Sequence, residues 1–116
     1  ITATVDLPTD WDGGAISIIL YWAPSTADAG NVVWQAIVGY LANNTQIDRA
    51  YDALVESIVA TPAVAEQMTE SAMSTFTPTI NRLRLCIARD GTSVTDTYNA
   101  HDAWLVGIQI NYTADS

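Results

Sequence analysis

The stretch Asn31–Ala42 reads Asn-Val-Val-Trp-Gln-Ala-Ile-Val-Gly-Tyr-Leu-Ala and is the longest nearly unbroken apolar run in the chain. Read with a period of two, it places apolar side chains on both faces, as a central strand of a sheet requires. A helical stripe through Val33, Ile37 and Tyr40 is also possible. The β-branched and aromatic content of the run, and the glycines in and beside it, favour a strand. We therefore expect a long central strand here.

Alternating apolar residues predict further strands on both sides of this run. We expect them over Ile1–Leu7, Ala15–Trp22, Val55–Thr61, Asn81–Asp90 and Ala103–Thr113. One short surface helix is expected over Gln46–Leu54, where apolar residues recur at helical spacing. Seven or eight strands with no βαβ rhythm predict an all-β fold, an antiparallel jelly-roll-like β-sandwich with one short helix.

The segment Ala63–Phe76 fits two structures. Its Ala, Met and Glu content has good helix propensity. Its mostly polar alternation, rich in hydroxyl side chains, suits an exposed strand, which is the structure we expect.

Composition bounds the class of protein. The 116 residues form one domain, 1–116, and because the first residue is not Met and already lies in a strand pattern, we expect it to be the C-terminal part of a longer chain. Only 15% of the residues are charged, against about 25% in ordinary soluble domains, which suggests buried subunit contacts. A net charge of -9 argues against nucleic acid and against an anionic membrane surface as partners.

Candidate residues for chemistry are few. The single histidine, His101, precedes Asp102, but no nucleophile-elbow motif accompanies it, so we expect no enzyme and no catalytic residue. The single cysteine, Cys86, lies in a predicted strand as a buried inert thiol, and no cofactor is expected. Loop carboxylates favour turns over a metal site, because the calcium-loop pattern is absent. If a cation binds, the candidate ligands are Asp10, Asp12, Asp90, Asp96 and Asp102.

Tryptophan and tyrosine raise a second possible function, a secreted or cell-surface carbohydrate-binding β-sandwich module. Trp11 and Tyr98 lie in predicted loops and are the candidates for surface contact with a glycan. The other three tryptophans occupy alternating strand positions and are expected in the core: Trp22, Trp34 and Trp104.

The order of the motifs along nearly the whole chain resembles that of a known family. The motifs are Leu-Pro-Thr-Asp-Trp-Asp-Gly-Gly-Ala-Ile-Ser-Ile (7–18), Tyr-Trp-Ala-Pro (21–24), Gly-Asn-Val-Val-Trp (30–34), Leu-Arg-Leu-Cys-Ile-Ala-Arg-Asp (83–90) and Asp-Ala-Trp-Leu-Val-Gly-Ile-Gln-Ile-Asn-Tyr (102–112). This succession resembles the C-terminal β-sandwich domain of tailed-phage structural proteins, such as head-fibre, tail-fibre and minor structural or decoration proteins. Ala63–Phe76 departs from that pattern, which has more Thr, Val and Gly there.

The resemblance implies a non-enzymatic virion protein, assembled in the host cytoplasm, that decorates the capsid or forms a head or tail fibre. It implies a homotrimer in contact with other virion proteins, with a host-surface glycan as a further candidate partner. The residues agree with an oligomer, although a monomeric sandwich could also bury both faces of its central strands. Val33, Ile37 and Leu41 are the predicted subunit interface, provided that no loop of the same chain covers them.

Overall fold

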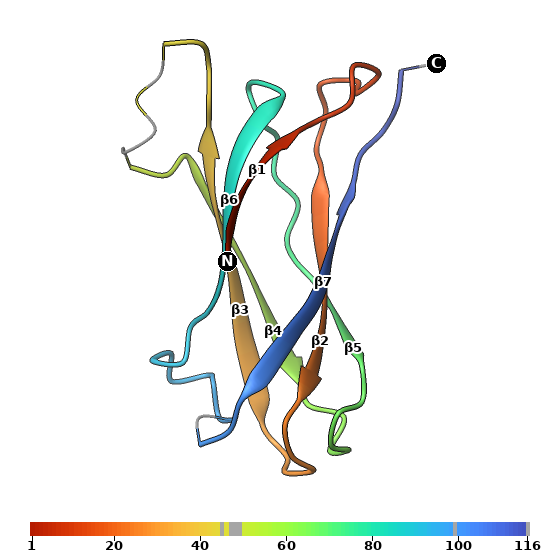
Figure 1. The fold of residues 1–116 in the computed structure, drawn as a ribbon, viewed down its shortest axis with the longest axis vertical. Helices are drawn as coiled ribbons and strands as arrows, with labels where there is room; N and C mark the ends of the chain where they lie inside the picture. The colour runs from red at the N-terminus through yellow and green to blue at the C-terminus, as the bar shows by residue number, and fades with distance from the viewer. Residues whose placement is uncertain (45, 47–49, 99, 116) are drawn as a thin grey trace.

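The computed structural model describes residues 1–44, 46, 50–98 and 100–115, which contain seven strands in two antiparallel sheets (Figure 1). The four-stranded sheet has the order β1 (Thr2–Asp6), β6 (Arg82–Arg89), β3 (Asn31–Tyr40), β4 (Ala53–Ala60). The three-stranded sheet has the order β5 (Thr69–Ala72), β2 (Ser17–Pro24), β7 (Ala103–Asn111). The predicted all-β antiparallel sandwich is confirmed, with its strands paired mainly to partners distant in sequence.

Strand β3 is the central strand that its sequence predicts. It pairs with β6 on one side and with β4 on the other. Its inner face is fully or almost fully buried and consists of Val32, Trp34, Ala36 and Val38. The long central strand expected from this run is therefore confirmed.

The core lies between the two sheets and is built from one face of each long strand. Strand β2 contributes Ile18, Leu20 and Trp22, none of which has exposed surface. The rings of Trp22 and Trp34 meet across the core, with centroids 6.0 Å apart. The prediction that these two tryptophans are core residues is confirmed.

The short helix predicted over Gln46–Leu54 is wrong, since the described residues contain no helix. Ala53 and Leu54 belong to β4, where they lie opposite Val38 and Ile37 of β3. A short isolated helix is marginal in water, whereas strand pairing gives the same residues a complete hydrogen-bonded ladder. Positions 47–49 of the predicted helix lie outside the described residues.

The segment Ala63–Phe76 forms a strand only over β5, four residues long. Before β5, Ala63 and Glu66 have positive φ values of 56° and 63°, which interrupt an extended chain. After it, Phe76 makes an isolated bridge with Ile16. The exposed-strand prediction is thus confirmed for part of the segment, and the helical alternative is absent.

Trp104 is the exception among the strand tryptophans, because 47% of its surface is exposed. Trp104 belongs to the edge strand β7 and lies opposite Ala23 of β2. The register of β7 against β2 shifts by one residue at this point. Gly107 lies opposite Tyr21 and Leu105 lies opposite Trp22, so Val106 between them has no partner on β2. Because the bulge inserts one residue, the side chains of β7 change faces at Val106. A regular period of two continued from Ile108 would place Trp104 in the core, and this prediction is wrong.

Candidate interaction surface

The two loop aromatics predicted to contact a glycan lie in different environments. Tyr98 has no exposed surface, and its hydroxyl donates to the carbonyl of Thr26 (3.2 Å) and accepts from the Thr26 N–H (3.0 Å). Trp11 is half-buried, and its indole N–H donates to the carbonyl of Gly14 (3.1 Å). Tyr98 is therefore not a surface contact, and of these two residues only Trp11 retains exposed surface.

Tyr98 belongs to a polar network that holds the loop after β6. The Arg89 guanidinium forms two hydrogen bonds to the Asp96 carboxylate, from Nε (2.8 Å) and from Nη2 (2.6 Å). The same guanidinium donates to the carbonyls of Tyr98 (2.6 Å) and His101 (2.7 Å). Asp96 also accepts the N–H of Val33 (3.1 Å), so the loop is fastened to β3.

Burial and hydrogen bonding act in opposite directions on the Asp96 carboxyl. Burial by itself raises its pKa, but the hydrogen bonds from Arg89 and from the Val33 N–H outweigh this, and the pKa lies below its ordinary value. The hydrogen bond to Asp96 raises the pKa of Arg89. This carboxylate, one of the five cation candidates, is thus neutralised by an arginine. Within the described part of the chain, no cluster of three His, Cys, Asp or Glu residues could hold a metal ion.

The lowered pKa of Asp96 predicts a specific loss of stability in acid. The unfolded chain, with an aspartate pKa near the ordinary 3.8, binds this proton more readily than the folded chain. The stabilisation is therefore complete above about pH 5 and is lost as the pH falls through the lower folded-state pKa. We expect urea unfolding between about pH 5 and pH 2.5 to show a steeper decline for the natural chain than for Asp96→Asn. Equal slopes would contradict this assignment.

His101 holds two loops together. Its ring centroid lies 4.9 Å from that of Tyr98, and its Nε2 lies 3.2 Å from an oxygen of Asp28. Asp28 precedes β3, whereas Tyr98 follows β6. His101 therefore links the loop before β3 to the loop after β6.

The predicted subunit interface is only partly accessible. Val33 is almost completely buried within its own chain, and the loop after β6 hydrogen-bonds to its backbone through the Asp90 N–H and the Asp96 carboxylate. Val33 is therefore not an interface residue. Ile37 and Leu41 remain half-buried, the first on β3 and the second directly after it.

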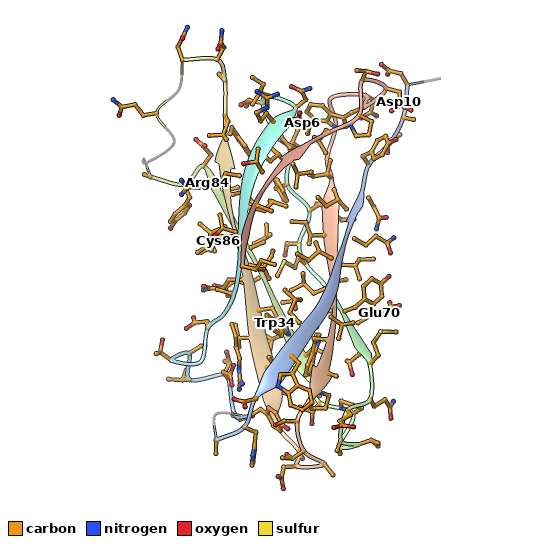
Figure 2. All side chains as sticks on the ribbon, in the orientation of Figure 1. Asp6, Asp10, Trp34, Glu70, Arg84 and Cys86 are labelled. Atoms are coloured by element: carbon orange, nitrogen blue, oxygen red, sulfur yellow. The ribbon has the colours of Figure 1, made fainter. Side chains whose placement is uncertain are left out.

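Ile37 lies on the outward side of the four-stranded sheet, in one row with Cys86 of β6 and Leu54 of β4. Exposed apolar residues extend this row into a surface that we call the outer apolar face, made up of Ile37, Leu41, Tyr51, Leu54 and Ile58. A hollow of about 20 Å³ lies in it, bordered also by Arg84 and Cys86. Figure 2 shows these two side chains on the flank opposite Glu70 of β5.

Cys86 is a free thiol and is half-buried on this face, rather than fully buried as expected. Sequence patterning found Ile37 and Leu41 but missed Leu54, which it assigned to a helix, and Ile58. In β4, Val55 and Ser57 point inward, so the alternating residues Leu54 and Ile58 must point outward. This alternation is the signal that identifies Leu54 and Ile58.

The chain was compared with known proteins. No protein-family model matches it, and neither the curated proteins nor the solved structures include a significant match. In the described segments, no helix is long and apolar enough to cross a membrane. The interpretation of function therefore depends on the geometry and on the order of the sequence motifs.

Proposed function

We propose that this domain is a non-enzymatic structural component of a tailed-phage particle, where it decorates the capsid or forms part of a head or tail fibre. In this proposal it forms a homotrimer through the outer apolar face and contacts other virion proteins. The ordered motifs support the phage assignment, and they fall on β2, β3, β6 and β7 of the sandwich.

The outer apolar face is the observation that carries the proposal. On β4, Leu54 and Ile58 point away from the core, where an ordinary exposed sheet face has polar side chains. Complete burial of an aliphatic side chain of this size contributes about 1.5–3 kcal/mol. A subunit contact over this face would supply that burial.

Charge repulsion between subunits opposes such a contact only weakly. Each chain carries a net charge of -9. On this face, Glu56 accepts a hydrogen bond from Gln35 (3.1 Å), and the arginine Arg84 lies beside the hollow. Charges elsewhere are screened beyond about 10 Å at 0.1 M salt. Apolar burial therefore decides the association.

The oligomeric state tests this proposal. Light scattering after size-exclusion chromatography should give three times the 12.5 kDa of one chain. In Ile58→Lys, a charge must be buried in the contact, so we expect the concentration for half-assembly to rise by about tenfold or more. Val64→Lys is the matched control, because Val64 is exposed to a similar extent (50% against 53%) in the loop after β4. A natural chain that stays monomeric at about 100 μM would contradict the proposal.

A second experiment tests the location in the particle. An antibody raised against the domain should label purified particles of the phage that encodes it at regular positions on the capsid or tail. Particles that contain no trace of the chain would exclude a virion role. We propose no carbohydrate-binding function, since Tyr98 is buried and Trp11 uses its indole N–H internally.

A further inference from the structure

The sandwich is open along one side, between the edge strands β1 and β7. A cavity of about 160 Å³ lies there. Its lining, among the residues that the structure describes, is aliphatic throughout and includes Ile1 and Val5 of the N-terminal strand region and Ile108 and Ile110 of β7. We call this cavity and its two flanking strands the seam. In Figure 1 the dark red β1 and the blue β7 both lie toward the viewer.

The opposite side of the sandwich is closed and protected. There β4 contacts β5, which is only four residues long. Each of these edge strands carries an acidic residue, Glu56 on β4 and Glu70 on β5. Short edge strands and charges are the usual devices that prevent unwanted strand pairing.

Strand β7 lacks these devices. It has nine residues, none of which is charged or a proline, and Trp104, Val106 and Ile108 are exposed along it. Its one irregularity is the bulge at Val106, which leaves Gly107–Asn111 in regular register with β2. An exposed apolar edge of this length is a site for pairing with another strand.

We propose that two copies of this chain pair through β7 across a twofold axis, joining two three-stranded sheets into one of six strands and covering both seams. Charge favours a second copy as the occupant. The chain has 13 acidic and 4 basic residues, but β1 and β7 together contain a single charged residue, Asp6. Asp6 is paired with Arg82 (2.8 Å). The seam therefore has no unpaired acidic side chain on β1 or β7 that would attract a basic partner. The seam of a second copy has the same neutral, apolar surface and matches it.

The regular half of β7 is complementary to itself. Ile108 and Ile110 lie opposite Leu20 and Ile18, so they share the inner face, and Gln109 points outward. An antiparallel pair of β7 strands centred on Gln109 brings Ile108 of each copy beside Ile110 of the other. The four isoleucines then form one apolar layer over the two cavities.

The expected size of the contact predicts a weak pair. A pair centred on Gln109 overlaps only residues 107–111 of each β7, about 17 Å of strand edge. The buried area is therefore below the roughly 1,200 Å² of a standard specific interface. The pair should accordingly be weak, with a dissociation constant above about 100 μM, and a disulfide can trap it. The pair uses neither Ile58 nor the rest of the outer apolar face, so it does not depend on the proposed trimer.

Disulfide trapping tests the pairing directly. Gln109→Cys places a thiol on the proposed twofold axis, where it meets its own copy; Cys86→Ser removes the natural thiol from every protein compared. Under mild oxidation we expect a covalent dimer of twice 12.5 kDa. Val94→Cys, in an exposed loop outside the seam, is the control and should remain mostly uncrosslinked. Equal crosslinking of the two variants, or none in either, would overturn the proposal.

A second substitution separates the seam from the outer apolar face. Adding Ile108→Lys to the Gln109→Cys protein should reduce the crosslinked fraction by about tenfold, because it places a charge within the apolar layer. Adding Ile58→Lys instead should leave crosslinking unchanged. If Ile58→Lys abolishes the crosslink, or if a folded Ile108→Lys protein keeps it, the pairing through β7 is wrong. A natural chain that forms no trimer, together with a crosslink in the Gln109→Cys protein, would reject the proposed trimer alone.

Discussion

Replacing Asp96 with alanine should lower the free energy of unfolding by about 3–5 kcal/mol, as expected when one partner of a buried ion pair is removed. The Asp96 side chain is fully buried, and Arg89, only 18% exposed, would lose the carboxylate that neutralises it. The Val33 N–H would also lose its acceptor. Urea unfolding at pH 7 would measure the change as a lower midpoint with an unchanged slope.

Asp102→Ala is the control for this substitution, because it removes an exposed carboxylate from the same loop. Its effect should stay within about 0.5 kcal/mol. The double variant Arg89→Ala with Asp96→Ala should lose less stability than the two single variants together, since each single variant leaves the other charge unpaired. Additive losses would mean that the two side chains act independently, contrary to the 2.6 Å contact between them.

Strand alternation was sufficient to predict the fold class, because most strands bury one face and expose the other. In β3 the positions that a period of two groups with Trp34 are buried: Val32, Ala36 and Val38. The period failed where the chain deviates from a regular strand. The bulge at Val106 moved Trp104 to the surface, and the positive φ values at Ala63 and Glu66 interrupt the extended chain before β5.

The helix predicted over Gln46–Leu54 failed for another reason. The residues at its end have a pattern that fits a helix and a strand, and pairing with β3 decides between them. That pairing joins Leu54 to Ile37, 17 residues earlier in the chain, and local periodicity does not detect such a contact.

The candidate surface was only partly predictable. Ile37 and Leu41 follow from the two-sided apolar pattern of β3, but Val33 has the same pattern and is buried. What distinguishes it is a loop some 60 residues later, fastened by Asp96 to its N–H. The Arg89–Asp96 pair was equally hidden, since an arginine at a strand end and an acid in the next loop form no recognisable motif.

Trp22→Ala should be the most damaging single substitution in the core. Trp22 has no exposed surface, and its ring packs 6.0 Å from that of Trp34, so truncation leaves a cavity between the sheets that costs about 3–5 kcal/mol. Its indole N–H also donates to the buried hydroxyl of Ser71 (2.8 Å), which links β2 to β5. Since domains of this size have about 5–15 kcal/mol of stability in total, the variant should be at or near the limit of folding.

Trp104→Ala is the matched control, because the same atoms are removed from a half-exposed position on β7. We expect a loss of about 1 kcal/mol or less, with most of the lost surface already in water. Trp22→Phe separates the two contributions: the ring still fills most of the space, so its cost of about 1–3 kcal/mol reports mainly the unpaired Ser71 hydroxyl. If Trp22→Ala and Trp104→Ala cost the same, the structure would have the wrong tryptophan in the core. If Trp22→Phe costs as much as Trp22→Ala, the hydrogen bond to Ser71 stabilises the fold more than the packing of the ring does, and β5 is held to the sandwich mainly through that bond.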